Sequence, residues 1–276
     1  MKHTVLVFAL LSAFTGFAQQ WTNLTPLRLT TEVRGVSFRN DTEGIMATFV
    51  EGGLFRTTDG GMSWQQIWAP QVNGNLYEVE YVSENVIITA GSNGGLFRSE
   101  DNGNSWDEIN SSTTQFIFSL EFINEQVGIG CGMLGTIIRT TDGGLTWTTI
   151  ASNSTNRLVD IFFLNETVGY IAGWGGTILR TTDAGESWSV VDTGTTTNLL
   201  SVHFTSESTG FTTGAGNAIF RTTNSGANGT LQTANVNQSA LFHIDFSSPM
   251  VGWAVGSEGS YYSTTNGGAS WTVNAP

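Results

Sequence analysis

One stretch of 13 residues, Gly135–Trp147, constrains the fold more than any other feature because it recurs along the chain. Full copies occur at Gly52–Trp64, Gly94–Trp106, Gly176–Trp188 and Gly259–Trp271, and a diverged copy at Asn217–Gly229. The aspartate or asparagine at its centre recurs every 41 or 42 residues, at Asp59, Asp101, Asp142, Asp183, Asn224 and Asn266. A fixed period of this length indicates one supersecondary unit used repeatedly.

Each unit contains four strand signals. The first alternates apolar and polar residues, as in Leu158–Phe163, and a second apolar strand follows at Val168–Gly173. A glycine-rich turn leads to a third strand at Thr177–Arg180, and the fourth begins at Trp188. No segment has a capped helical stripe. The repeat therefore predicts an all-β protein, a β-propeller of four-stranded antiparallel blades.

The number of blades depends on the N-terminal tryptophan, Trp21. It stands 17 residues before Phe38, just as Trp64 stands 17 residues before Tyr81. Trp21 thus begins a fourth strand without the rest of a blade. We expect six blades, with the Trp21 strand packed as an extra edge or sealing the ring. The alternative is seven blades, one of them incomplete.

The N-terminus has the features of a secretory signal peptide. Lys2 is followed by a short apolar run, Thr4–Phe14, and then by the small residues Gly16 and Ala18. We expect cleavage near Ala18, a secreted or periplasmic protein, and a single propeller domain over residues 19–276. No later stretch is apolar enough to span a membrane. The single cysteine, Cys131, excludes an internal disulfide and is expected to be a core residue.

The charge of the chain excludes some partners. The formal net charge is −13, and loss of Lys2 with the signal peptide makes it −14. Nucleic acids and anionic membranes are bound by cations placed against phosphates, so neither is expected as a partner. We expect a monomer that binds an extracytoplasmic protein or a glycan.

The repeated aspartates are expected to stabilise turns and not to catalyse a reaction or bind a metal. An aspartate or asparagine can accept hydrogen bonds from backbone N–H groups two or three residues further on. The tryptophan at the end of each copy should be buried where neighbouring sheets meet. These tryptophans are Trp64, Trp106, Trp147, Trp188 and Trp271. The diverged fifth copy lacks its tryptophan, which predicts the loosest blade.

Arginine also recurs at a fixed position of the repeat, and residues that share one repeat position are called a column below. Arg56, Arg98, Arg139, Arg180 and Arg221 share one position of the repeat, and Ser263 takes it in the sixth unit. A ring of anion-binding arginines is one interpretation. The favoured one is structural: the arginines pair with carboxylates across blades, such as Glu80, Glu121 and Asp245 of the innermost strands.

The pattern Ser/Thr-x-Asp-x-Gly-x-Ser/Thr-Trp, as in Thr57–Trp64, resembles the Asp-box, or bacterial neuraminidase repeat. The longer pattern Gly-x-x-x-Arg-Thr-Thr-Asp-x-Gly-x-x-Trp is similar to that of the photosystem II stability and assembly factors. The resemblance extends over Trp21–Trp271. It implies a propeller without enzymatic activity that supports assembly or stability of a protein complex. Because Asp-boxes also occur in sialidases and xyloglucanases, carbohydrate binding or glycoside hydrolysis remains the alternative.

Binding residues are sought where the repeat breaks its symmetry. On the face that carries the turns between second and third strands, Trp174 and Met133 are bulky where most copies have small residues. An exposed tryptophan beside polar groups can anchor a protein or stack on a sugar. The candidate site comprises Trp174, Met133, Glu51, Asn93, Glu258 and Arg157. No catalytic residue, cofactor or metal site is expected, because no His/Cys/Asp spacing fits a metal.

Overall fold

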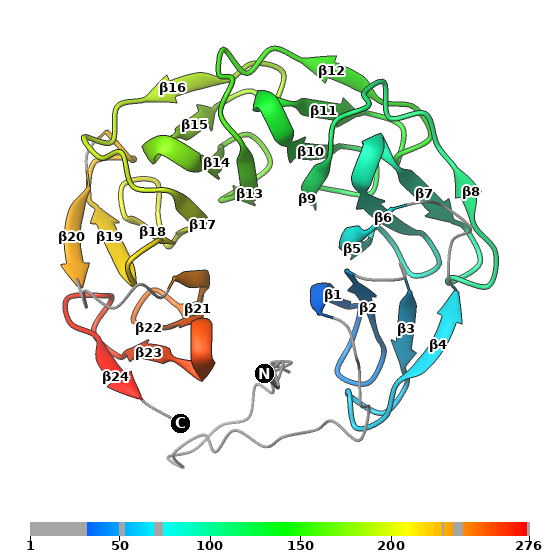
Figure 1. Ribbon diagram of the computed structural model, residues 1–276, viewed down its shortest axis with the longest axis horizontal. Coiled ribbons are helices and arrows are strands. Elements are labelled where there is room, and N and C mark those ends of the chain that lie inside the picture. Colours follow the sequence, from blue (N-terminus) through cyan, green and yellow to red (C-terminus); the bar gives the residue numbers. More distant parts are fainter. Residues whose placement is uncertain (1–31, 50–52, 69–73, 228, 234–239, 275–276) are drawn as a thin grey trace.

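The computed structural model describes residues 32–49, 53–68, 74–227, 229–233 and 240–274. Within these ranges, 24 strands form six four-stranded antiparallel sheets, each with its strands in sequence order. The sheets are arranged as blades around a central axis (Figure 1). The predicted all-β propeller with six blades is therefore confirmed.

The first three blades are regular. The first consists of β1 (Val33–Phe38), β2 (Gly44–Thr48), β3 (Leu54–Thr57) and β4 (Gln65–Trp68). The second consists of β5 (Leu76–Tyr81), β6 (Ile87–Gly91), β7 (Leu96–Ser99) and β8 (Asp107–Glu108). The third consists of β9 (Ile117–Phe122), β10 (Gly128–Gly132), β11 (Ile137–Thr140) and β12 (Thr148–Ile150).

The last three blades repeat this order. The fourth consists of β13 (Leu158–Phe163), β14 (Gly169–Gly173), β15 (Ile178–Thr181) and β16 (Ser189–Val191). The fifth consists of β17 (Leu199–Phe204), β18 (Gly210–Gly214), β19 (Ala218–Thr222) and β20 (Thr230–Thr233). The sixth consists of β21 (Leu241–Ser248), β22 (Val251–Gly256), β23 (Tyr261–Thr264) and β24 (Thr272–Asn274).

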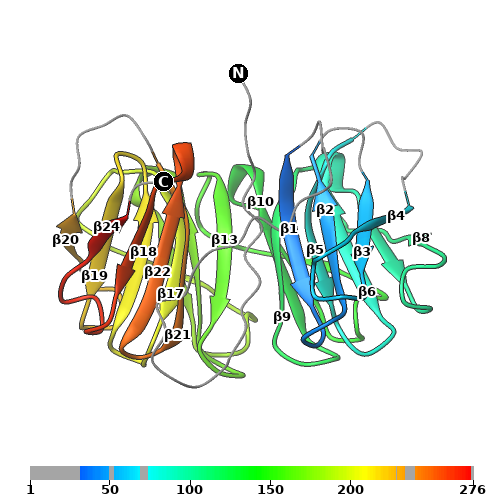
Figure 2. The same ribbon diagram turned by 90° about the horizontal axis from the view of Figure 1, so that it is seen from below.

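Short 3₁₀ turns join the second and third strands of four blades: η1 (Ser92–Gly94), η2 (Met133–Gly135), η3 (Trp174–Gly176) and η4 (Ser257–Gly259). All four lie on one face of the disc, which is uppermost in Figure 2 and is called the upper face below. The Asp-box turns, which join third and fourth strands, lie on the opposite, lower face.

The third blade shows how an Asp-box turn is held. The Asp142 carboxylate accepts hydrogen bonds from the Thr140 hydroxyl (2.7 Å), the Thr146 N–H (2.9 Å) and the Thr146 hydroxyl (2.6 Å). The Gly144 N–H donates to Thr140 Oγ1, and Gly144 has φ +82°, a conformation that favours glycine. The backbone N–H common to the aspartate copies comes from the fourth residue on, and Asp101 also accepts the N–H of the third residue on, Asn104, as predicted. The N–H of the second residue on is bound instead by the preceding hydroxyl, as Thr140 binds that of Gly144.

The tryptophan of each Asp-box links the turn to the core. Trp147 donates from its indole to the Gly144 carbonyl oxygen (3.1 Å) and is only 3% exposed. Its ring packs edge-on against Phe122, with centroids 5.9 Å apart. It also joins a cluster that contains Ile88 of the second blade and Ile138 of the third. The two columns of the repeat, tryptophan and phenylalanine, thus meet between neighbouring blades.

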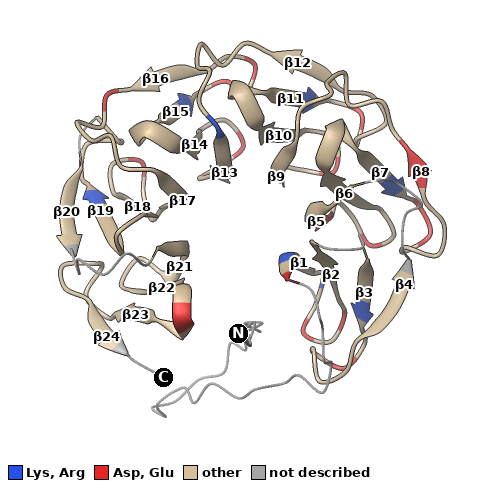
Figure 3. Ribbon diagram, in the orientation of Figure 1, with Lys and Arg blue, Asp and Glu red and all other residues tan. Residues whose placement is uncertain are grey.

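The arginine column contacts the next blade, but through other partners than predicted. Arg98 Nε donates to the Gly143 carbonyl oxygen and Arg139 Nε to that of Ala184, both at 2.9 Å. Arg56 donates to the carbonyl oxygen of Asn102. Each acceptor lies inside the Asp-box turn of the following blade. Figure 3 shows these arginines on the third strands, outside the innermost strands that carry the carboxylates. The predicted pairing with Glu80, Glu121 or Asp245 is therefore wrong, because the two columns lie at different radii. Pairing with a carboxylate across blades does occur between Arg139 and Glu186 of the next turn, at 3.5 Å.

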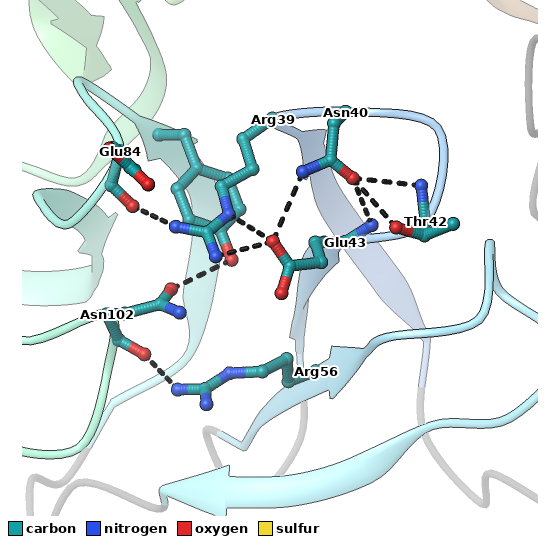
Figure 4. Close-up of polar contacts among 8 residues, drawn as sticks. Arg39, Asn40, Thr42, Glu43, Arg56, Glu84 and Asn102 are labelled. Carbon is teal, nitrogen blue, oxygen red and sulfur yellow. Dashed lines mark hydrogen bonds and ion pairs between the residues drawn. The ribbon is translucent and has the colours of Figure 1, made fainter.

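The first two blades are also joined at their lower turns (Figure 4). Arg39 pairs with Glu43 in its own turn and donates to the backbone oxygen of Glu84 in the next blade. The Tyr81 hydroxyl donates to the Asn102 side chain at 3.2 Å. Side-chain to backbone bonds of this kind fix the relative position of blades without burying a charged pair.

Among the described residues, the ring of blades is open between the first and sixth blades (Figure 1). Val36 of β1 is 41% exposed, whereas the equivalent apolar residues of the other five blades are only 1–5% exposed. On the sixth blade, Trp253, Val255 and Tyr261 are partly exposed at positions that are buried in the other blades. These surfaces correspond to inter-blade contacts elsewhere. Trp21 and the expected signal peptide lie outside the described residues.

The fifth blade has a packing defect where its tryptophan is missing. Gly229 occupies the tryptophan position, and it lines an apolar cavity of about 30 Å³ together with Phe204, Phe220 and Gly226. A Cβ atom built at Gly229 would meet Phe220 at 3.5 Å, an ordinary contact. The site therefore has room for a Cβ atom at position 229.

We expect Gly229→Trp to raise the free energy of unfolding by about 1 kcal/mol, because filling a cavity restores lost contacts. Chemical denaturation of the variant and the wild type would measure this. Leu231→Trp is the control, since Leu231 lies on β20 of the same blade and is 49% exposed. Equal or lower stability of Gly229→Trp than of wild type would contradict the assignment of the defect.

Candidate binding face and central channel

The innermost strands present a ring of residues on the upper face. Near the start of each innermost strand the register shifts by one residue, which is a β-bulge. The bulged residues are Arg34, Tyr77, Phe118, Val159, Leu200 and Phe242. A bulge re-aims its side chain, so these six residues surround the mouth of the channel instead of lining it. Most are apolar, and Phe242 is 57% exposed.

Four neighbouring blades carry a continuous set of aromatic and arginine side chains, called the aromatic row below. The row consists of Arg34, Phe49, Tyr77, Phe116, Phe118, Arg157 and Trp174. The guanidinium of Arg34 lies 4.7 Å from the centre of the Phe49 ring, and that ring lies 5.6 Å from Tyr77. The Tyr77 and Phe118 rings are edge-on at 4.9 Å.

Arg157 forms the other end of the row. Its guanidinium carbon lies 4.0 Å from the centre of the Phe118 ring and 5.0 Å from that of Trp174. Cation–π contacts of this kind stabilise a charge that is partly removed from water. Burial lowers the pKa of Arg157 from its ordinary value, and its Nε is buried without a hydrogen-bond partner.

The structure brings together only some of the predicted site residues. Trp174 is 41% exposed, its backbone N–H donates to the Arg157 carbonyl oxygen, and the two side chains stack. Met133 is partly buried, whereas the adjacent Leu134, which the sequence analysis passed over, is 63% exposed. Leu134 has φ +55°, which turns its side chain outward at the tip of η2.

The remaining predicted residues are spread around the ring. Asn93 in η1 and Glu258 in η4 are both exposed at turn tips with positive φ, and their turns lie on opposite sides of the channel (Figure 1). Glu51 lies outside the described residues. Tyr77 and Phe118 were missed, although their bulky character at one repeat position was visible in the sequence.

Below the mouth, the channel contains a cavity of about 320 Å³ lined by all six innermost strands. Its ionisable lining residues are Glu78, Glu80, Glu121, Asp160, His203, His243 and Asp245. They occupy the third and fifth positions of the innermost strands, so the alternation of the strands directs them to the axis. Among the described residues that line the cavity, none is a lysine or an arginine.

One half of the channel is internally hydrogen-bonded. The Asp160 carboxylate accepts the Val202 N–H at 2.8 Å, and Ser201 Oγ lies 3.3 Å from His243 Nδ1. His203 Nδ1 lies 3.3 Å from Asp245 Oδ1. Burial raises the pKa of Asp160, an effect opposed by nearby His243, and burial lowers the pKa of His203.

The other half holds three glutamates. Burial raises the pKa of Glu78 to about 8 and that of Glu121 to about 8, and repulsion from Asp160 adds to both effects. Burial, with repulsion from Glu121, raises the pKa of Glu80 well above its ordinary value. Glu80 accepts the Phe122 N–H at 3.1 Å through Oε1, but its buried Oε2 has no hydrogen-bond partner.

Comparisons with known proteins agree with the fold. The family model of the photosynthesis system II assembly factor YCF48 matches residues 98–195. A solved structure of YCF48 bound to D1 peptide has a TM-score of 0.74 at 18% identity, covering 90% of this chain and 82% of that chain. YCF48 from Cyanidioschyzon merolae gives 0.71 at 16% identity, with 90% and 86% covered. The chain is an Asp-box β-propeller similar to YCF48.

This Asp-box propeller is also similar in fold to enzymes. The GH74 enzyme of Niastella koreensis has a TM-score of 0.72 at 14% identity over 87% of this chain. The chain spans 46% of that enzyme, so the likeness concerns less than half of it. Among curated proteins, no relative matches the sequence. At such identities the structural matches show the fold alone.

Two negative findings concern the described residues only. No helix in them is long and apolar enough to cross a membrane. Nor do three or more of their His, Cys, Asp or Glu side chains converge as metal ligands would.

Proposed function

We propose that this propeller is a non-catalytic protein-binding factor that supports the assembly or stability of a protein complex, with the upper face as its docking surface. The observation that carries the proposal is the aromatic row. Tryptophan, tyrosine and arginine contribute most of the binding energy in protein interfaces, and they do so as clusters. Here they are stacked before any partner arrives, which lowers the entropic cost of binding.

Two further observations support a polypeptide ligand. The YCF48 family model matches residues 98–195, which include the third and fourth blades and the row residues Phe116, Phe118, Arg157 and Trp174. The solved YCF48 structure of similar fold contains a D1 peptide. The acidic net charge of −13 favours partners that are not themselves strongly acidic.

We propose an extracytoplasmic location, because Lys2, the apolar run Thr4–Phe14 and Ala18 form a signal-peptide pattern. Mass spectrometry of the protein purified from envelope and culture fractions tests this. A mature chain that begins at Gln19 supports export, and an intact N-terminus in the cytoplasmic fraction opposes it.

Trp174→Ala should abolish partner capture and leave stability within about 0.5 kcal/mol of wild type, since the residue is exposed at a turn tip. Wild type and the variant would serve as crosslinking baits against native envelope and secreted fractions. The matched control is Leu145→Ala, which removes a 51% exposed apolar side chain from the lower face. Capture lost with both variants, or unfolding of Trp174→Ala, would refute the assignment of the upper face.

Glycan recognition is the second candidate, because an exposed indole can stack on a sugar and the fold is shared with GH74 enzymes. Arg157 lies over the Trp174 ring, and Trp174 is still 41% exposed. Release of reducing ends from xyloglucan, or binding of its oligosaccharides lost with Trp174→Ala, would favour this function over the first.

A further inference from the structure

The channel is an acidic cavity whose charge is unbalanced. Five carboxylates and two histidines line about 320 Å³, a volume at the lower end of the range of about 300–1,000 Å³ for small-ligand sites. The Asp160, His243, His203 and Asp245 half is satisfied by its own hydrogen bonds. The half that holds Glu78, Glu80 and Glu121 is not fully hydrogen-bonded in this way.

A specific atom marks the unsatisfied half. Glu80 Oε2 is buried and accepts no hydrogen bond from the described residues, and leaving such an oxygen unpaired is unfavourable. Glu121 lines the same cavity, and repulsion from it contributes to the raised pKa of Glu80. One positively charged hydrogen-bond donor between Glu80 and Glu121 would pair the unsatisfied oxygen and offset the repulsion.

The nature of that donor follows from the lining. The described side chains do not converge as a metal-binding group does, which argues against a directly coordinated metal ion. Phe162, Leu120 and Val79 give the cavity apolar walls, which suit the methylene part of an organic cation.

We infer that the central channel binds an organic cation with a primary ammonium or guanidinium head, which donates hydrogen bonds to Glu80 and Glu121. This site is separate from the aromatic row and does not depend on the proposed protein-binding function. The cation is either a lysine or arginine side chain of a polypeptide or a free polyamine. The charged head is the same in both cases.

Binding should release protons. The glutamates that face the site are Glu78 and Glu80 from β5 and Glu121 from β9, with Asp160, His203, His243 and Asp245 opposite them. Because the pKa of Glu121 is raised to about 8, a cation must displace its proton at neutral pH. Affinity should therefore increase about tenfold between pH 7 and pH 9, where an amine is still protonated.

The test is calorimetric titration of the whole protein with two probes, spermidine and the blocked tripeptide acetyl-Gly-Lys-Gly-amide. Acetyl-Gly-Gln-Gly-amide is the uncharged control peptide. We expect one of the cationic probes to bind, with proton release that appears as a dependence of the heat on the buffer's ionisation enthalpy. Binding of spermidine alone identifies a free polyamine as the ligand, and binding of the tripeptide alone identifies a side chain.

The matched variants are Glu80→Gln/Glu121→Gln in the channel and Glu84→Gln/Glu125→Gln in exposed lower turns. Both remove two charges, but only the channel pair should weaken binding, by at least tenfold, and abolish proton release. The inference is overturned if neither cationic probe binds. It is also overturned if both double variants weaken binding equally, or if the uncharged peptide binds as well as the charged one.

Discussion

Trp147→Ala should lower the free energy of unfolding by about 3–5 kcal/mol, the largest loss expected from a single substitution in this chain. The indole is 3% exposed, touches residues of two blades and closes its own Asp-box turn through the Gly144 carbonyl oxygen. Alanine would leave a cavity between the blades and an unpaired carbonyl. Denaturant unfolding followed by circular dichroism measures the loss.

Leu145→Ala is the control for that experiment, because Leu145 lies in the same turn but is 51% exposed. It should change stability by no more than about 0.5 kcal/mol. If Trp147→Ala cost no more than Leu145→Ala, the tryptophan would not be part of the core, and the account of the Asp-box as an inter-blade link would fail.

Glu78→Gln should stabilise the protein at alkaline pH. The folded protein raises the pKa of Glu78 to about 8 from its ordinary value of 4.5, so between these values the native state holds a proton that the unfolded chain releases. Stability from this group is fully present below pH 4.5 and is lost as pH rises through 8. Glutamine has no proton to lose, so the variant escapes that loss.

The difference between variant and wild type should grow by about 1.4 kcal/mol per pH unit in this window, which amounts to about 2–4 kcal/mol at pH 7.5. Urea unfolding at pH 5, 6.5 and 7.5 measures it. The control Glu84→Gln, at an exposed turn, should run parallel to wild type. Parallel curves for Glu78→Gln as well would mean that Glu78 is already ionised in the folded channel.

At acidic pH, stability is limited by carboxyl groups whose pKa is lowered in the folded protein. Hydrogen bonds from Ser105 and Ser99 lower the pKa of Asp101 in its Asp-box to about 2. A lowered pKa gives stability above the unfolded value that is lost as pH falls toward 2. Between pH 4 and 5, therefore, neither Glu78 nor Asp101 takes much stability from the wild type.

The repeat allowed the propeller architecture to be predicted from the sequence. Residues such as Trp147 and Phe122 recur with the period of the blade, and a residue that recurs with the scaffold is selected by packing that also recurs. The same property explains what was missed. Arg98 and Arg139 donate from Nε to backbone carbonyl oxygens of the next turn, and a backbone acceptor leaves no signature in the sequence.

The cluster of ionisable residues in the channel was not predicted from the sequence, for a different reason. Glu78, Asp160 and His243 are more than 80 residues apart from one to the next, and only convergence of the innermost strands on one axis joins them. Their positions in the repeat were visible in the sequence, but the repeat alone does not show that these positions meet at one axis. The bulge that turns Tyr77 and Phe118 onto the upper face depends on strand register, which the alternation of residue types does not reveal.

The opening beside Val36 gives the propeller two free ends. In a circular arrangement every blade has two neighbours, and no blade can detach without breaking two interfaces. Here the first and sixth blades each rest on one neighbour among the described residues. Stability in such an array is a sum of local and nearest-neighbour terms, so fluctuations that expose backbone should begin at the ends and fade toward the third and fourth blades. Arg157 and Trp174 belong to the fourth blade, far from either free end. Backbone amide hydrogens in this part of the molecule should therefore exchange with solvent most slowly.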